Sequence, residues 1–215
     1  MECQQCQGIE TTFNDKLALK DLKKYREKGP NKTTHAMINF LKNEGIKEMT
    51  LLDIGGGVGV IQHELLKNGM SRAISVDASS SYIYTSKKEA EHQGLIDRVT
   101  YHHGNFIDLA PNIPITDVVT LDRVICCYPD MDKLVENSVA HARNYYGIVF
   151  PKDTLWMKVG MALVNGFQKL RRSNFRGYVH SKKKIYKIIQ SNNFERCFNQ
   201  KAGFWHIEVY RKSKV

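Results

Sequence analysis

The sequence has no apolar run that approaches the length of a membrane-spanning helix, and its first residues, MECQQCQGIE, lack a basic region followed by an apolar one. These absences argue against a membrane-spanning protein and against a secretory leader, so we expect a cytoplasmic protein. No internal repeat or low-complexity linker divides the chain. With 215 residues and 42% hydrophobic content, it can bury one substantial core.

Cysteine is scarce, and the five cysteines do not form the pattern of a disulfide framework. Cys126 and Cys127 are adjacent and the others are scattered, so reduced thiols are the simplest interpretation. Cys3 and Cys6 form one C-x-x-C pair, but a structural zinc site needs two more ligands at suitable spacing. No second pair lies nearby, so we assign no metal site and leave open whether these two cysteines bind a metal.

Acidic residues are absent from residues 154–194, although the chain as a whole carries 22 of them. The same segment holds nine basic residues, against a formal net charge of +10 for the whole chain. These are Lys158, Lys169, Arg171, Arg172, Arg176, Lys182, Lys183, Lys184 and Lys187. Such a segment attracts carboxylates, phosphates, anionic lipid or nucleic acid. The alternative is a solvated basic face that serves only solubility.

What the sequence does contain is a glycine-rich turn directly after a short apolar run. Residues 51–54, LLDI, have the character of a strand buried on both faces of a parallel sheet. Glycines in the following turn permit positive φ angles and let a ligand lie against the backbone. A helix predicted for residues 60–68 then points its N-terminal amides at that ligand. The turn comprises Gly55, Gly56, Gly57, Val58 and Gly59.

A second predicted strand, residues 73–77, ends at Asp77, 24 positions after Asp53. In doubly wound folds, a carboxylate at this place accepts hydrogen bonds from both ribose hydroxyls of a nucleotide. The glycine turn and this carboxylate together indicate a nucleotide-type cofactor site.

The details of the turn favour S-adenosylmethionine over a dinucleotide. A dinucleotide fingerprint, G-x-G-x-x-G, needs a small residue at its third glycine position. Counted from Gly55, that position is Val60; counted from Gly57, it is Gln62. Asp53 lies two residues before the first glycine, where a carboxylate can bind the ammonium group of a methionine moiety, directly or through water.

The motif D-x-G-x-G-x-G, from Asp53 to Gly59, resembles motif I of the class I S-adenosylmethionine-dependent methyltransferases. Asp77 is similar to the acidic residue that closes the second strand in that family. The resemblance covers about residue 34 to the C-terminus. It implies an α/β, Rossmann-like doubly wound sheet of seven strands, mostly parallel, with a C-terminal antiparallel hairpin.

The later sequence patterns supply the elements that this fold requires. Helices are predicted for residues 81–93, 131–143, 155–170 and 181–190. Strands are predicted for residues 99–103, 117–122 and 145–150, and a hairpin for residues 194–200 and 204–210.

The resemblance also implies which residues contact the cofactor. In the family, a turn such as Gly104-Asn105-Phe106 contacts the adenine, with an amide on the exocyclic amine and a ring packed on the base. A plain strand-end turn with Phe106 in the core is the alternative. Asp122 and Arg123 stand at the end of a strand, where open α/β sheets place their ligands. The predicted cofactor contacts are Asp53, Gly55, Gly56, Gly57, Val58, Gly59, Asp77, Ala78, Asn105, Phe106, Asp122 and Arg123.

Residues 1–45 are predicted to form a helical segment that packs over the cofactor site, ahead of a methyltransferase domain at residues 46–215. Two helix patterns lie within residues 15–43, separated by Gly29 and Pro30. The apolar positions near one face of the first are Leu17, Leu19, Leu22 and Tyr25. The runs KDLKKYREKGPNKTT, LDIGGGVG and LDRVICCYPD together resemble bacterial methyltransferases that are similar to magnesium-protoporphyrin O-methyltransferases.

The catalytic chemistry is less readable than the cofactor site. Methyl transfer is an in-line displacement that depends largely on alignment, so a dedicated base can be absent. If one exists, Tyr128 and Asp130 are candidates by position, after the fourth strand. This region lacks the N/D-P-P-F/Y sequence of amino-directed nucleic-acid methyltransferases. Cys126 and Cys127 also lack the proline-cysteine pattern of cytosine-C5 enzymes, which favours structural cysteines.

The sequence therefore predicts an S-adenosylmethionine-dependent methyltransferase that acts on a small, anionic or amphipathic acceptor. In proteins with this fold, the segment between the fifth and sixth strands, here residues 154–194, often forms part of the wall of the substrate pocket. An RNA methyltransferase stays open because of the basic segment, and so does a non-catalytic cofactor-binding partner subunit. An NAD-linked oxidoreductase is a more distant alternative.

The apolar helix at residues 155–170 can belong to the core, line an apolar pocket or touch a membrane surface. Nothing in the sequence indicates the acceptor atom or the oligomeric state.

Overall fold

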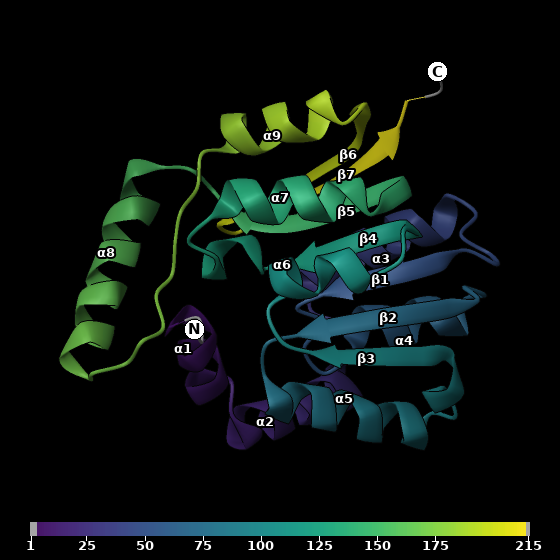
Figure 1. Ribbon diagram of the computed structural model, residues 1–215, viewed down its shortest axis with the longest axis horizontal. Helices are drawn as coiled ribbons and strands as arrows, with labels where there is room; N and C mark the ends of the chain where they lie inside the picture. The colour runs from purple at the N-terminus through teal and green to yellow at the C-terminus, as the bar shows by residue number, and fades with distance from the viewer. Residues whose placement is uncertain (1–3, 214–215) are drawn as a thin grey trace.

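The computed structural model describes residues 4–213, and a seven-stranded sheet forms its centre (Figure 1). The strand order is β3-β2-β1-β4-β5-β7-β6. Strands β1 to β5 pair in parallel, whereas β7 runs antiparallel to both β5 and β6. The strands are β1 (Thr50–Ile54), β2 (Arg72–Asp77), β3 (Val99–His103), β4 (Thr116–Asp122), β5 (Ala142–Pro151), β6 (Phe194–Ala202) and β7 (Trp205–Lys212). This confirms the predicted fold class, including the C-terminal hairpin.

Helices cover both faces of the sheet because successive strand residues point to opposite sides. Leu51 packs in the cluster that includes α3 and α4, whereas its neighbour Leu52 packs in the cluster that includes α7 and α9. Both leucines are fully buried, as expected of a central parallel strand. The helices are α1 (Gln4–Thr12), α2 (Asp15–Lys28), α3 (Lys32–Asn43), α4 (Val60–Lys67), α5 (Ser80–His92), α6 (Phe106–Leu109), α7 (Met131–Ala140), α8 (Leu155–Leu170) and α9 (Lys182–Ser191).

The N-terminal helices differ in what they cover. Helix α3 is part of the packed body, since Met37 and Leu41 lie in the core cluster under the sheet. Helix α2 instead buries Ala18, Leu22 and Tyr25 in a small cluster with Val58 and Tyr82, beside the glycine turn. Leu19, expected on the same apolar face, is 60% exposed.

The structure corrects one predicted helix end and excludes one of the arrangements considered for the helix at residues 155–170. The helix predicted for residues 131–143 is too long, because α7 ends at Ala140 and Ala142 already pairs with Thr116 in the β4–β5 ladder. The long-range pairing overrides the local helical pattern. Helix α8 does not belong to the core: none of its residues is buried, and it lies apart from the sheet (Figure 1). No helix among residues 4–213 is long and apolar enough to cross a membrane.

Candidate cofactor and substrate site

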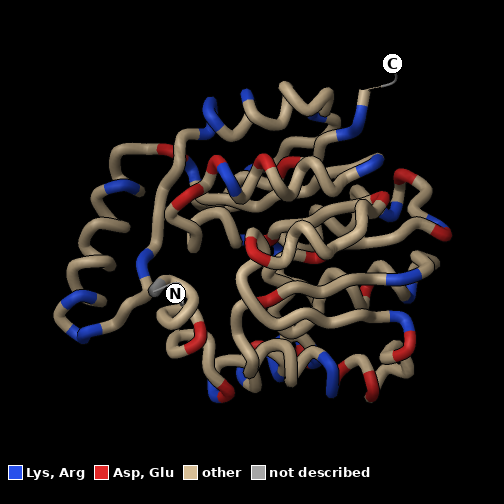
Figure 2. Tube along the Cα trace, in the orientation of Figure 1, with Lys and Arg blue, Asp and Glu red and all other residues tan. Residues whose placement is uncertain are grey.

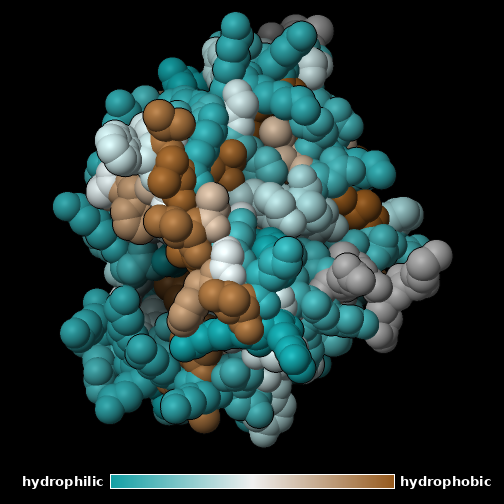
Figure 3. All heavy atoms as spheres, turned by 90° about the vertical axis from the view of Figure 1, so that its left-hand side faces the viewer, coloured by the Kyte–Doolittle hydropathy of each residue, from teal (hydrophilic) through white to brown (hydrophobic). Residues whose placement is uncertain are grey.

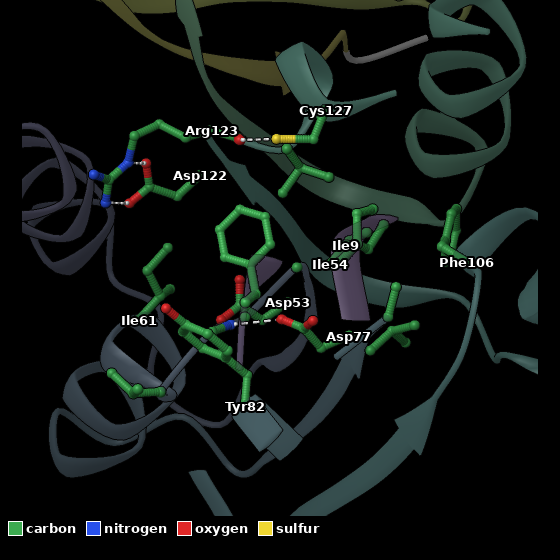
Figure 4. Close-up of a pocket in the computed structure, with 18 of the residues that line it drawn as sticks. Ile9, Asp53, Ile54, Ile61, Asp77, Tyr82, Phe106, Asp122, Arg123 and Cys127 are labelled. Atoms are coloured by element: carbon green, nitrogen blue, oxygen red, sulfur yellow. Dashed lines mark hydrogen bonds and ion pairs between the residues drawn. The ribbon is translucent and has the colours of Figure 1, made fainter. Parts of the chain in front are cut away.

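A cavity of about 470 Å³ opens at the carboxyl ends of β1, β2 and β4. This is the edge where open parallel sheets bind their ligands, because the loops that leave neighbouring strands diverge there. Eleven of the twelve predicted cofactor residues line it; Gly59 does not. Figure 4 shows Asp53, Asp77 and Asp122 around this space, with Ile9 contributed by α1.

The glycine turn has the backbone that the sequence predicts. Gly55 and Gly57 have φ angles of 64° and 57°, in the left-handed region that favours glycine. A Cβ atom on Gly55 would lie 2.4 Å from a methyl carbon of Val124. A Cβ on Gly56 would lie 3.0 Å from both Asp53 Oδ2 and Ser75 Oγ. The turn therefore passes directly over the Asp53 carboxylate, and side chains would obstruct it.

Gly59 has a different position from the other glycines of the turn. It precedes the first residue of α4 with a φ angle of 85°. A Cβ atom there would lie 2.5 Å from His63 Cε1 and 2.5 Å from Ser86 Oγ of α5. Gly59 thus permits the close approach of α4 and α5 and lies outside the cavity wall.

Gly59→Ala is expected to lower the free energy of unfolding by at least about 1 kcal/mol, since a left-handed non-glycine residue alone has a strain of this order. The clash with His63 and Ser86 adds to that strain. The affinity of the folded protein for its cofactor should not change. Chemical denaturation and calorimetry measure the two effects separately. Gly45→Ala is the control, because Gly45 has φ 75° with no atom within 4 Å of an added Cβ; equal losses in both variants would contradict the packing role.

Asp53 is a buried carboxylate with one unused oxygen. Its Oδ1 accepts a hydrogen bond of 2.7 Å from Thr120 Oγ1, whereas Oδ2 has no partner among the described residues. Burial raises the pKa of Asp53 to about 7, and the nearby charges of Asp122 and Asp77 act in the same direction. Asp53 lines the cavity, and its unpartnered Oδ2 is buried beneath the glycine turn. A cationic ligand group, bound directly or through water, would compensate the lost hydration of this carboxylate.

Asp77 is fixed at the end of β2 by two backbone amides. Gly57 N donates to its Oδ2 over 3.0 Å and Ser79 N donates to its Oδ1 over 2.9 Å (Figure 4 draws the first). Burial raises the pKa of Asp77, and these two hydrogen bonds oppose the shift. Each oxygen keeps a second lone pair, so the carboxylate can still accept hydrogen bonds from a pair of ribose hydroxyls.

The turn after β3 contributes both to the cavity wall and to the core. Asn105 and Phe106 line the cavity, yet Phe106 is only 3% exposed and belongs to the main core cluster. Asn105 Oδ1 accepts a hydrogen bond from the Tyr128 hydroxyl, and it also receives the Ile107 amide as the N-cap of α6. The sequence did not reveal α6 because this helix has only four residues.

Asp122 ends β4 and forms an ion pair with Arg123, the next residue, at the cavity wall, with 3.0 Å between Arg123 Nε and Asp122 Oδ1. The Thr34 hydroxyl of α3 also donates to Asp122. Arg123 is a non-glycine residue with φ 63°, and its guanidinium lies 6.0 Å from the Trp205 ring centre. A positive φ at a non-glycine residue occurs preferentially at functional sites. Asp122 is therefore occupied by Thr34 and Arg123. The Arg123 side chain is 41% exposed beside this carboxylate and also lines the cavity.

The two residues considered as catalytic bases lie in different environments. Tyr128 lines the cavity. Asp130 does not: its carboxylate caps α7 by accepting from Lys133 N, and it lies 3.6 Å from Lys133 Nζ. This position does not support a catalytic role for Asp130.

Several cavity residues gave no sequence signal. Helix α1 covers one side of the cavity with Gln5, Cys6 and Ile9, and Phe13 follows just after its end; the sequence of α1 is polar and has no clear apolar period. Tyr25, which the sequence places on the apolar face of α2, also lines the cavity, and its hydroxyl donates to Glu64. The neighbouring Arg26 does not line the cavity and pairs with Glu89.

None of the nine basic residues of the segment 154–194 lines the cavity, so the expectation that this segment walls the substrate pocket is wrong. Lys158, Lys182 and Lys184 form ion pairs with acidic residues from other parts of the chain. Among residues 4–213, no cluster of His, Cys, Asp or Glu has the arrangement of a metal site. Cys3, half of the C-x-x-C pair, lies outside the described residues.

A doubly wound sheet with a glycine turn after β1, a carboxylate ending β2 and a C-terminal antiparallel hairpin defines the class I S-adenosylmethionine-dependent methyltransferases. Residues 26–200 match the family model described as methyltransferase domain, so the chain belongs to this family. S-adenosylmethionine is the cofactor of this class.

Individual relatives are distant. Protein arginine N-methyltransferase 1 of Saccharomyces cerevisiae is 28% identical over 109 residues, 49% of this chain and 30% of that protein. Ribosomal protein L11 methyltransferase of Escherichia coli O8 is 31% identical over 71 residues, 33% of this chain and 24% of that protein. The alignments thus span less than a third of these curated relatives. The fold is similar to magnesium protoporphyrin IX methyltransferase of Synechocystis with bound SAH, with a TM-score of 0.67, 19% identity, and coverage of 84% of this chain and 82% of that one.

Proposed function

We propose that the protein transfers the methyl group of S-adenosylmethionine to a small amphipathic acceptor that carries an anionic group. One observation supports both halves of this proposal. Asp53, whose buried Oδ2 has no partner among the described residues, and Arg123, whose side chain is 41% exposed beside Asp122, line the same cavity, the first for a cationic cofactor and the second for an anionic acceptor.

The residues present fit the cofactor. Asp77 would accept the ribose hydroxyls, Asp53 would hold the ammonium group, and the turn at Gly55 to Gly57 leaves room for the ligand against the backbone. Phe106 and Asn105 form the wall for the adenine. When bound, S-adenosylmethionine supplies an electrophilic methyl group on a sulfonium sulfur. The protein's own contribution is to align the acceptor with that group and to exclude water.

The acceptor side of the cavity combines a cation with aromatic surface. Arg123 lies beside Trp205, and Lys24 of α2 also lines the wall. Apolar side chains from the N-terminal segment, Ile9 of α1 and Phe13 just after it, also line the cavity. An acceptor with an apolar body and a carboxylate or phosphate end complements this lining. The solved neighbour from Synechocystis, a magnesium protoporphyrin IX methyltransferase, is named for an acceptor of this kind.

A dedicated base is not required for such an acceptor. A carboxylate is ionised at neutral pH and presents its nucleophilic oxygen without proton transfer. Tyr128 donates to Asn105 and thereby positions the adenine wall, which is a role in cofactor binding. For this reason we assign the catalytic contribution of the chain mainly to alignment by Arg123 and the cavity walls.

Arg123→Gln is expected to lower kcat/KM roughly tenfold for a carboxylate acceptor and to leave competitive inhibition by the corresponding amide nearly unchanged, because the guanidinium interacts with the anion through partly screened charge. The assay follows radiolabelled methyl transfer to aromatic and aliphatic amphipathic carboxylates, with each amide added as a competitor that lacks the nucleophilic oxygen. Lys183→Gln is the matched control, since Lys183 lies outside the cavity.

Three outcomes would contradict this proposal. Tighter binding of the amides than of the carboxylates would remove the anionic specificity, and faster transfer to RNA in the same assay would favour the nucleic-acid alternative. Intact cofactor binding without transfer to any of these acceptors, together with a tightly bound second chain, would favour a non-catalytic partner subunit.

A further inference from the structure

Helix α8 presents a continuous apolar row to solvent. Leu155, Trp156 and Leu170 are 73%, 84% and 83% exposed, and no residue of this 16-residue helix is buried. Figure 3 shows these side chains as a band that runs along one side of the molecule. Single exposed apolar residues are ordinary, but a contiguous row marks an interaction surface. The exposed row consists of Leu155, Trp156, Val159, Leu163, Val164, Phe167 and Leu170.

The row is a face of the helix, not a disordered patch. Residues 156, 159, 163, 167 and 170 follow one another at intervals of three or four, and Leu155 and Val164 flank them, which places the row along one side of an α-helix. At about 1.5 Å per residue, the helix extends for about 24 Å. This length suits a helix that lies along a surface.

The opposite side of α8 is fastened to the chain that follows it. Asn165 Nδ2 donates to Gly177 O over 2.8 Å, and Gly177 N donates back to Asn165 Oδ1 over 2.9 Å. Met161 lies against Gly177 so closely that a Cβ there would be 2.4 Å from the sulfur. The protein therefore holds α8 in one orientation, with the apolar row directed outward.

The charge around the exposed row is positive. Lys169, Arg171 and Arg172 stand at the C-terminal end of α8, and none of them forms an ion pair among the described residues. The Arg171 guanidinium lies 4.2 Å from the Phe167 ring centre, so cation and apolar row adjoin. Figure 2 shows basic residues here and no acidic residue between α8 and α9.

This charge pattern selects the kind of partner. A second copy of the same face would cover the apolar row but would bring no carboxylate from residues 154–194 to Lys169, Arg171 and Arg172, since that segment contains none. A nucleic acid would neutralise the cations but would leave the apolar row in water. An anionic lipid surface satisfies both, because acyl chains receive the apolar side chains and phosphates receive the basic ones.

The segment that fastens α8 also forms part of the surroundings of the cavity. Tyr178 N donates to Cys126 O over 2.7 Å. Gln5 of α1 donates through Nε2 to Cys127 O and to Arg176 O, over 2.7 and 2.9 Å. Since Gln5, Cys126 and Cys127 line the cavity, a surface that binds α8 lies next to its entrance.

We propose that α8 is an in-plane membrane-binding helix, whose apolar row enters the headgroup boundary of an anionic bilayer while Lys169, Arg171 and Arg172 contact lipid phosphates. The contact goes beyond the proposed function and does not depend on it. If the membrane contact and the proposed function are both correct, an amphipathic acceptor would reach the cavity from the bilayer.

The test is co-sedimentation of the whole protein with vesicles of phosphatidylcholine alone or of phosphatidylcholine and phosphatidylglycerol in equal parts. Binding to the mixed vesicles is expected to be at least about tenfold stronger, and weaker at high salt. The double variant Trp156→Ser, Leu163→Ser should lose at least about tenfold of this binding. The matched control is Leu19→Ser, Ile115→Ser, which replaces exposed apolar residues outside α8 and should bind as the unchanged protein does.

Charge is tested with the triple variant Lys169→Gln, Arg171→Gln, Arg172→Gln against the control Lys183→Gln, Lys187→Gln. Only the triple variant should lose the preference for mixed vesicles. Circular dichroism shows whether each variant is folded. Calorimetric titration with S-adenosylmethionine then separates loss of membrane binding from failure of the proposed function.

The proposal is overturned if the protein binds mixed vesicles no better than neutral ones. It is also overturned if the variant Trp156→Ser, Leu163→Ser binds mixed vesicles as well as the control Leu19→Ser, Ile115→Ser does. A dimer in light scattering that Trp156→Ser, Leu163→Ser dissolves, without vesicle binding, would assign the face to a second copy. RNA binding that the triple variant abolishes, again without vesicle binding, would assign it to nucleic acid.

Discussion

Asp77→Ala is expected to weaken S-adenosylmethionine binding by about 10- to 150-fold, which corresponds to about 1.5–3 kcal/mol for hydrogen bonds to a charged group. The carboxylate is buried at the end of β2 and is aimed by the amides of Gly57 and Ser79. No side chain has to be ordered when the ribose hydroxyls bind, because these hydrogen bonds already fix the carboxylate. The loss should therefore appear in full as lost affinity.

The alanine variant also removes the partner of Gly57 N, so part of the loss can come from the glycine turn. Asp77→Asn separates the two contributions, since its amide oxygen can still receive one backbone amide while the second ribose interaction and the charge are lost. Glu10→Ala is the control for a carboxylate at the same edge of the sheet: Glu10 accepts from Ser80 N but does not line the cavity. It should bind the cofactor normally.

Calorimetric titration with S-adenosylmethionine, S-adenosylhomocysteine and NAD checks this prediction. The unchanged protein should bind both adenosyl ligands and not NAD. An unchanged affinity in folded Asp77→Ala would contradict the ribose assignment, and binding of NAD alone would contradict the cofactor assignment itself.

The part of the site that could be predicted from the sequence is the part formed by local backbone geometry. Asp53 and Asp77 end or nearly end two adjacent buried strands, and parallel pairing brings such ends to one edge of the sheet. The positive φ angles of Gly55 and Gly57 likewise follow from a tight turn between a strand and a helix. Each of these inferences needs only a few neighbouring residues.

The remainder depends on packing between distant segments. Ile9 and Trp205 line the same cavity although they lie near opposite ends of the chain, and neither belongs to a local motif. Asp130 follows the fourth strand as predicted, but helix capping turns its carboxylate away from the cavity. The apolar period of α8 is correct, yet a helical period has the same appearance whether its apolar face meets the core or solvent.

Cofactor affinity is expected to rise as the pH increases from about 5 to 7, by up to tenfold per pH unit, because Asp53 has a pKa of about 7 in the free protein. Below this value the buried carboxyl is protonated and cannot pair with an ammonium group. Binding must then release a proton, so the observed enthalpy of titration should depend on the ionisation enthalpy of the buffer.

Methylthioadenosine is the control ligand for this effect, since it has the adenosine but lacks the amino acid. Any pH dependence that arises from Asp77 and the ribose affects both ligands, so the difference between them isolates Asp53. In Asp53→Asn, the two ligands should show the same pH dependence. A difference that persists in this variant would contradict the assignment of Asp53 to the ammonium group.

The same pKa determines how Asp53 affects stability. The pKa of Asp53 is higher in the folded protein than in an unfolded chain, where it is about 3.9. The protonated carboxyl therefore contributes its full stabilisation to the folded protein below about pH 3.9, and this contribution is lost as the pH rises through about 7. Asp53→Asn should therefore raise the Tm of the ligand-free protein at pH 8 while it weakens S-adenosylmethionine binding. If Asp53→Asn lowered the Tm as well as the affinity for S-adenosylmethionine, the carboxylate would stabilise the fold through Thr120 and would not serve mainly to bind the cofactor.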